Sequence, residues 1–107
     1  ALIDETGVLV VVACGNSAVD ACGVSPASIQ ATLTVGASDL ENKFCSSSSS
    51  SSSSSADVLY PHTNYGACLD LFAPGVDIFS ACGGAKRCAE PSDRAFALSS
   101  GTSNAAP

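Results

Sequence analysis

The sequence has no Trp, no Met and few basic residues, and these shortages exclude several classes of protein. Four Lys and Arg stand against ten Asp and Glu, which gives a net charge of -6. Nucleic-acid-binding domains carry basic patches, so this balance argues against a nucleic acid partner. Cationic substrates and a bound metal ion remain compatible with it. No apolar run approaches the roughly 20 residues that a membrane helix needs, so we expect no membrane span.

Aromatic residues make up only 6% of the chain, whereas hydrophobic residues of all kinds make up 46%. A hydrophobic share of this size argues against disorder throughout, so we expect a core built from Val, Leu, Ile and Ala. The 107 residues are at most one small domain, or a piece of a larger one. Because residue 1 is not Met, we expect a mature product or an excised segment.

Six cysteines are many for this length, but their spacing does not match a zinc site. The chain has no CxxC pair, and His62 is its single histidine. A setting that permits disulfides explains this cysteine content better. We therefore predict a secreted, extracellular protein.

A continuous apolar, β-branched run at residues 8–13 predicts the first strand. Runs that do not alternate with polar residues are typical of strands buried on both faces of a parallel α/β sheet. Gly15 ends the run, so Asn16 is expected at the carboxyl end of a central strand. Open α/β sheets bind their ligands at that end.

Further strands are predicted at residues 32–37, 69–72 and 76–79 and within 95–100, with a turn at 73–75. The final segment, GTSNAAP, predicts the start of a helix. Few helices are visible, although parallel strands need crossover connections, so the chain reads as an incomplete α/β segment.

Ten consecutive serines interrupt the chain and form the centre of a low-complexity insertion at about residues 45–57. Such a tract has nothing to bury, so we expect a surface loop without regular structure.

Four blocks occur in the order found in subtilisin-like serine peptidases, and the chain most resembles the proteinase K-like branch of that family. The blocks are GVLVVVACGNS, SPASIQATLTVGASD, NYGACLDLFAPGVDIFSAC and LSSGTSNAAP. The resemblance covers nearly the whole chain apart from the insertion and residues 83–94. It implies that residues 1–107 are the C-terminal-side part of a subtilisin-like catalytic domain, of class α/β, with a mainly parallel sheet and flanking helices.

The resemblance assigns two catalytic residues, the nucleophile Ser103 and the oxyanion-hole Asn16. A hydroxyl needs a neighbouring base to become a nucleophile. A helix start at Ser103 would also direct its backbone N–H toward the developing oxyanion. Each residue has a structural alternative, because serine often caps helices and asparagine often follows glycine in turns. The order of the four blocks favours the catalytic interpretation.

The family's catalytic Asp and His both lie upstream of the strand at residues 8–13. His62 does not match the family's His block, and its ordinary interpretation is a solvated loop histidine. Without a base, this segment alone is not expected to be an active peptidase. The remainder of its catalytic domain is therefore an expected partner, and a peptide or protein is the expected substrate.

The resemblance also implies a substrate cleft and a metal site. The cleft residues are Ala13, Cys14 and Gly15 on one wall and Val24, Ser25, Pro26 and Ala27 on the other. A structural Ca²⁺ would be held by the backbone carbonyls of Gln30 and Thr32 and by the carboxylate of Asp70, since oxygen ligands suit this ion. Asp70 as a simple strand-end residue is an equal alternative. No organic cofactor is expected.

The cysteines fall into three groups. Cys22 and Cys68 match a disulfide found in relatives of proteinase K, and Cys82 and Cys88 are near enough in sequence to close a local loop. Cys14 is expected to be a buried free thiol. The remaining Cys45, beside the serine tract, has no evident partner.

Two other functions remain open from the sequence. A non-catalytic subtilisin-like module, with a structural or binding role in an extracellular assembly, is favoured by the serine tract. Asn104 favours it too, because most family members carry Met or another small or apolar residue after the nucleophile. A disulfide-stapled binding domain unrelated to peptidases would require all six cysteines to be paired.

Overall fold

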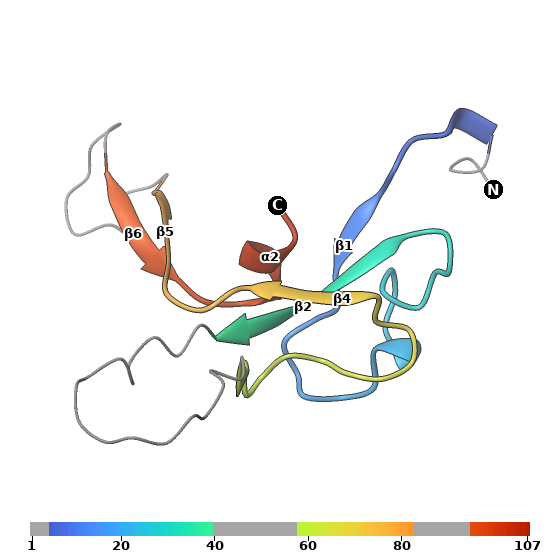
Figure 1. Ribbon diagram of the computed structural model, residues 1–107, viewed down its shortest axis with the longest axis horizontal. Coiled ribbons are helices and arrows are strands. Elements are labelled where there is room, and N and C mark those ends of the chain that lie inside the picture. Colours follow the sequence, from blue (N-terminus) through green and yellow to red (C-terminus); the bar gives the residue numbers. More distant parts are fainter. Residues whose placement is uncertain (1–4, 40–57, 83–94) are drawn as a thin grey trace, which may run out of the picture.

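The computed structural model describes residues 5–39, 58–82 and 95–107, which form two small sheets, a 3-10 turn and a short helix (Figure 1). The first sheet contains β1 (Val11–Ala13), β2 (Leu33–Asp39), β3 (Val58–Leu59) and β4 (Leu71–Pro74). The second contains β5 (Ile78–Ala81) and β6 (Phe96–Ser99). The turn is η1 (Ala21–Gly23) and the helix is α2 (Thr102–Ala105).

The central strand of the first sheet is β2, which has parallel neighbours on both edges. Val35 of β2 is in register with Ala13 of β1 on one edge and with Leu71 of β4 on the other. The short β3 pairs antiparallel with the end of β2, at Ser38 and Asp39. Three of the four strands therefore run in one direction, and the predicted α/β class with a mainly parallel sheet is confirmed.

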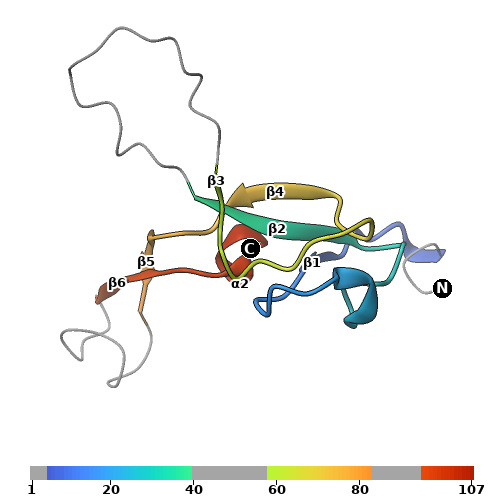
Figure 2. The ribbon, with the colours of Figure 1, turned by 90° about the horizontal axis from the view of Figure 1, so that it is seen from below.

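Helix α2 packs on one face of this sheet (Figure 2). Its Ala105 lies in a cluster with Val35 and Ala37 of β2. The antiparallel pair β5 and β6 extends away from the first sheet and leads directly into α2 (Figures 1 and 2). The predicted strand within residues 95–100 and the helix start after it are both confirmed.

The first predicted strand is wrong in its extent, because β1 begins only at Val11. Val8 and Leu9 precede it and are 57% and 69% exposed, so the prediction that the whole run is buried on both faces is also wrong. The physical reason is register. Leu33, where β2 begins, is opposite Val11 and donates from its N–H to the Val10 carbonyl at 2.9 Å, so Val8 and Leu9 have no strand partner among the residues described.

Strands β4 and β5 each lie two residues further along the chain than predicted, and β2 ends two residues later than predicted, at Asp39. β4 includes Pro74, which was predicted to be in a turn. Proline has no N–H to donate to β2, but the neighbouring Gly75 N–H donates to the Ser38 carbonyl of β2 at 2.9 Å, so the pairing continues past Pro74. β5 begins at Ile78 because Asp77 has φ +52°, which interrupts the extended backbone. The two-residue β3 was not predicted.

The core consists of two small clusters rather than one large one. Cys14, Ala21 and Ala27 form the first, and Val35, Ala37 and Ala105 form the second. The expected Leu and Ile do not contribute fully buried side chains in the described part of the chain. Small residues are needed where the elements meet, and Gly75 shows why: a β-carbon there would stand 2.7 Å from the Ala37 β-carbon and 2.8 Å from the Gly101 carbonyl.

Within residues 5–39, 58–82 and 95–107, no helix is both long and apolar enough to cross a lipid bilayer. The serine-rich insertion, Cys45, Cys88 and residues 83–94 lie outside the described residues.

Candidate active site

The candidate site lies at the carboxyl end of β1, where the chain leaves the sheet. Cys14 N–H donates to the Val35 carbonyl at 2.9 Å and ends the pairing with β2. Gly15 follows with φ +106°, a conformation that glycine adopts without strain. The sharp change of direction presents Asn16 as an exposed residue. Asn16 follows the carboxyl end of a strand, as the sequence predicted, but the prediction of a central strand is wrong, because β1 pairs only with β2 among the residues described.

The segment before α2 is brought to the same place by backbone hydrogen bonds. Gly101 N–H donates to the Gly75 carbonyl at 2.7 Å, just beyond the end of β4. Thr102 N–H donates to Asn16 Oδ1 at 2.8 Å, and Thr102 Oγ1 accepts from Gly15 N–H at 3.3 Å. These two hydrogen bonds join Thr102 to Asn16 and Gly15, which lie 86 and 87 positions earlier in the sequence.

Asn16 and Ser103 approach each other around Gly101. A β-carbon on Gly101 would stand 3.5 Å from Asn16 Nδ2 and 3.7 Å from Ser103 Oγ. Because Asn16 Oδ1 accepts from Thr102, the Nδ2 donor is the end of the amide left for another group. The arrangement therefore places an amide donor and an exposed hydroxyl beside one small space.

The backbone N–H of Ser103 is a second donor at this place. It lies in the first turn of α2, where N–H groups have no partner within the helix. It has no acceptor among the residues described. A developing negative charge near Ser103 could thus receive hydrogen bonds from this N–H and from Asn16 Nδ2, which is the arrangement of an oxyanion hole.

No described side chain that could act as a general base contacts Ser103. His62 is exposed, its ring packs edge-on against Tyr60 at 5.4 Å, and its carbonyl accepts from Ala18 N–H at 3.0 Å. These contacts fit the loop histidine expected from the sequence. Asn104, next to Ser103, donates from Nδ2 to the Ser99 hydroxyl at 3.2 Å and so bonds toward β6.

The residues predicted to line the substrate cleft differ in exposure. Cys14 and Ala27 are 0% and 1% exposed and pack together in the first core cluster. Ala13, Gly15 and Val24 are half-buried. Ser25 and Pro26 are exposed and joined by a cis peptide bond. Side-chain contact with a substrate is thus open to the exposed members. The Cys14 side chain is buried, its N–H donates to Val35 and its carbonyl accepts from Asn64 Nδ2.

The three predicted calcium ligands line one cavity of about 140 Å³. Gln30 and Thr32 come from the segment just before β2, and Asp70, Ala67 and Cys68 come from the segment before β4. Asp70 Oδ2 accepts from Thr34 N–H at 2.7 Å, whereas Oδ1 has no hydrogen-bond partner in the described part of the chain. Asp70 is the only carboxylate that lines this cavity, and no cluster of three His, Cys, Asp or Glu side chains occurs among the described residues.

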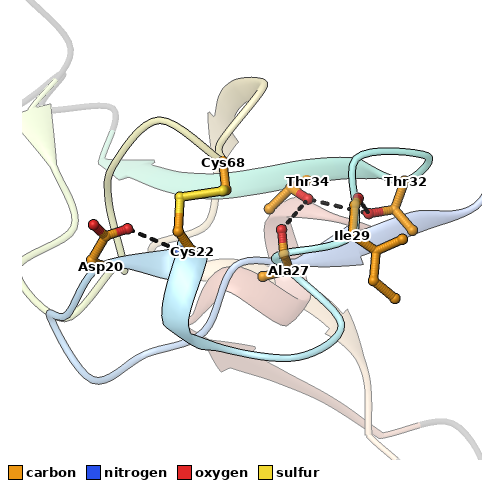
Figure 3. Close-up of a disulfide and its surroundings, with 7 residues drawn as sticks. All are labelled: Asp20, Cys22, Ala27, Ile29, Thr32, Thr34 and Cys68. Carbon is orange, nitrogen blue, oxygen red and sulfur yellow. Dashed lines mark hydrogen bonds between the residues drawn. A yellow bond between two sulfur atoms is a disulfide. The ribbon is translucent and has the colours of Figure 1, made fainter.

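A hydrogen-bonded loop shapes the Thr32 side of this cavity (Figure 3). Thr32 Oγ1 donates to the Ile29 carbonyl at 2.8 Å, and Thr34 Oγ1 donates to the Ala27 carbonyl at 3.1 Å. These bonds turn the chain so that it enters β2 directly after the loop. A cavity lined by the Asp70 carboxylate and by Gln30 and Thr32 contains oxygen groups of the kind that hold an oxygen-ligated cation.

The predicted disulfide between Cys22 and Cys68 is present and joins η1 to the segment before β4 (Figure 3). Asp20 caps η1, because its Oδ1 accepts from Cys22 N–H at 2.9 Å. Cys14 is a buried free thiol, as predicted. Cys82 is disulfide-bonded, but the pairing predicted for it involves Cys88, which lies outside the described residues.

Sequence reasoning missed two buried residues that organise the site, Thr102 and Asn64. Thr102 is 0% exposed and makes both bonds to the Gly15–Asn16 turn. Asn64 is 1% exposed and bonds to the loop that follows β1. In the sequence, Thr102 is next to the candidate nucleophile Ser103 and has no signal of its own, and Asn64 in TNYG is typical of a turn residue.

A sequence model described as the Subtilase family matches residues 2–107. The chain is 42% identical over 103 residues to Subtilisin-like protease 1 of Pseudogymnoascus destructans, which is 96% of this chain and 20% of that protein. It is also 42% identical over 103 residues to Cerevisin of Saccharomyces cerevisiae, 96% of this chain and 13% of that protein. With Alkaline protease 1 of Aspergillus clavatus the identity is 48% over 77 residues, 72% of this chain and 15% of that one.

The fold is similar to the crystal structure of a cold adapted subtilisin-like serine proteinase, with a TM-score of 0.59 and 35% sequence identity. The match covers 89% of this chain and 26% of that one. The chain therefore spans between 13% and 26% of the length of the similar proteins named here.

Proposed function

The chain belongs to the subtilase family, and from this premise we propose that the protein of which it is a part is a serine endopeptidase. Ser103 is its nucleophile, and Asn16 with the Ser103 backbone N–H forms its oxyanion hole. The observation that carries the proposal is the bond from Thr102 N–H to Asn16 Oδ1 at 2.8 Å. This bond turns the Asn16 Nδ2 donor toward the space beside the Ser103 hydroxyl.

In the proposed reaction, Ser103 Oγ attacks the carbonyl carbon of a peptide bond and its proton passes to a base. The carbonyl oxygen becomes an oxyanion that accepts hydrogen bonds from Asn16 Nδ2 and Ser103 N–H. The C–N bond then breaks, the leaving amine takes the proton from the base, and an acyl-enzyme remains. Attack by water on this ester releases the acid and restores the hydroxyl.

The base and its orienting carboxylate come from the remainder of the catalytic domain. His62 is not the base in this proposal, because its contacts are with Tyr60 and with the backbone of Ala18. The segment described here thus contributes the nucleophile and the oxyanion hole, and residues elsewhere in the protein contribute proton transfer.

The substrate is a peptide or protein that binds in extended form at the end of β1, beside Ala13. At Cys14 and Gly15 the backbone N–H and carbonyl groups already bond to Val35, Asn64 and Thr102. An extended peptide can pair with exposed backbone groups as an added strand. Ser25 and Pro26 are exposed and available to side chains of the substrate, whereas the Cys14 side chain is buried. The half-buried Val24 belongs to the second wall of the proposed cleft, whereas Ala27 is buried in the core behind it.

We further propose a structural Ca²⁺ in the cavity lined by Gln30, Thr32 and Asp70. The cavity of about 140 Å³ and the unpartnered Asp70 Oδ1 support this assignment. Backbone carbonyls of Gln30 and Thr32 would complete the protein ligands, with water at the remaining positions. When bound, the ion would supply cross-linking between the loop before β2 and the segment before β4.

A secreted location is proposed on the basis of the disulfide. The Cys22–Cys68 bond joins residues 46 positions apart, and such bonds persist in oxidising compartments.

The experiment that tests the function is fluorophosphonate labelling of the protein from its native source, with the labelled peptide identified by mass spectrometry. These probes react with a serine when its base and oxyanion hole are assembled, so label on Ser103 is expected. A Ser103→Ala variant is the matched control and should take no label. Absence of label on folded wild-type protein would contradict the proposal and favour the non-catalytic, structural or binding module.

A further inference from the structure

We infer that Asn64 is a positioning residue for catalysis, which holds the loop that carries Asn16 in the geometry of the oxyanion hole. The inference rests on the proposed function, because it assigns Asn64 a role that acts through Asn16. Asn64 itself lies outside the space beside Ser103, and its atoms bond to the loop rather than to a substrate.

The side chain of Asn64 uses both ends of its amide on the loop after β1. Its Oδ1 accepts from Ser17 N–H at 3.0 Å and from Val19 N–H at 3.1 Å. Its Nδ2 donates to the Cys14 carbonyl at 2.8 Å. Asn16 lies between Cys14 and Ser17, so the Asn64 amide forms hydrogen bonds to the loop on both sides of Asn16.

The backbone of Asn64 adds two further contacts to the same loop. Its N–H donates to the Gly15 carbonyl at 2.9 Å, and its carbonyl accepts from the Cys14 thiol at 3.4 Å. Contact with Gly15 is close enough that a β-carbon there would stand 2.4 Å from Asn64 Nδ2. The loop is therefore in direct contact with Asn64, and no side chain could separate them.

These contacts matter because residues 14–19 have no regular secondary structure to fix their position. Asn64 is 1% exposed, so water cannot easily replace its hydrogen bonds. Truncation to Ala would leave the Ser17 and Val19 N–H groups without this acceptor. The backbone bonds of the loop to Asn64 and His62 would remain, but the segment from Ser17 to Val19 would lose two hydrogen bonds. A misplacement of Asn16 by about 1 Å can cost roughly 10²-fold in rate.

The test is a double-mutant cycle on the full protein, measured as kcat and KM on a peptide p-nitroanilide. Asn64→Ala is expected to lower kcat by about 10- to 100-fold and to change KM less than about threefold. In an Asn16→Ala background the same change should lower kcat by less than about threefold, because its effect passes through Asn16. An equal loss of kcat in both backgrounds would overturn the inference, as would an unchanged kcat with Asn16 intact.

Asn64→Asp provides a second variant should the Ala variant not fold. It keeps an oxygen for Ser17 and Val19 but places a second carboxylate oxygen against the Cys14 carbonyl, so kcat should again fall only when Asn16 is present. Asp20→Ala is the control, since it removes the side-chain acceptor of Cys22 N–H at the start of η1, and this side chain bonds to no residue of 14–19. Its kcat should stay within about twofold of wild type.

The cycle separates failure of this inference from failure of the proposed function. If Ser103 takes label and Asn16→Ala lowers kcat, but Asn64 and Asn16 act independently, the proposed function stands and the role of Asn64 is refuted. If Asn16→Ala leaves kcat unchanged, or Ser103 takes no label, the oxyanion hole itself is refuted and the role of Asn64 with it.

Discussion

Replacement of Gly101 by Ala is the perturbation that most directly probes the space between Asn16 and Ser103. Gly101 has φ +151° and ψ +166°, a region that is essentially restricted to glycine. An alanine held there costs on the order of 1–3 kcal/mol of folding free energy. That range corresponds to a roughly 5- to 150-fold fall in the folding equilibrium constant.

The effect on catalysis follows from where the methyl group would stand. Its distances of 3.5 Å to Asn16 Nδ2 and 3.7 Å to Ser103 Oγ are ordinary van der Waals contacts, so neither side chain must move. The methyl would instead occupy space needed by the oxyanion. We expect kcat to fall at least as far as on loss of the asparagine donor, which in subtilisin, a member of the same family, lowers kcat by about 10²–10³-fold.

Substitutions at two other glycines serve as controls that distinguish occlusion of the site from backbone strain. A β-carbon added at Gly23 would have nothing within 4 Å, so Gly23→Ala should alter neither stability nor kcat. Gly7 also has open space but a φ of +66°, so Gly7→Ala should cost about 1–2 kcal/mol of stability and leave kcat unchanged.

The assay measures kcat per active site by burst titration, and stability by urea unfolding in a Ser103→Ala background that prevents self-digestion. A Gly101→Ala protein that keeps kcat within about threefold of wild type would refute the placement of the oxyanion beside Gly101.

Two further predictions concern stability. Replacement of Cys22 and Cys68 by Ser removes a cross-link between residues 46 positions apart and so increases the conformational entropy of the unfolded chain. The free energy of unfolding, measured by urea titration, should fall by about 4 kcal/mol. A loss below about 1 kcal/mol would contradict this entropic argument. Removal of Ca²⁺ with a chelator should lower the Tm of the wild-type protein, whereas Asp70→Asn, which keeps an acceptor for Thr34 N–H, should show no such dependence in calorimetry. An equal chelator effect on both proteins would place the ion elsewhere.

Local sequence chemistry was enough to predict most of the strands, but not all of their ends. The β-branched run before Gly15 predicted β1, yet β1 is shorter than the run because strand length depends on where β2 begins opposite Val11. Pro74 was predicted to be in a turn, since a single sequence does not reveal that a neighbouring residue supplies the bond to β2. Strand limits are set by partners distant in sequence.

The sequence by itself determined the class of fold, the Cys22–Cys68 disulfide and the candidate roles of Asn16 and Ser103, because these depend on ordered blocks of residues. Only the tertiary structure revealed Thr102 and Asn64, whose side chains act on residues more than 40 positions away. It also decided which end of the Asn16 amide is free, because Thr102 N–H occupies Oδ1. Hydrogen bonds between distant segments have no local signature, since each partner alone resembles an ordinary polar residue of a turn or a helix end.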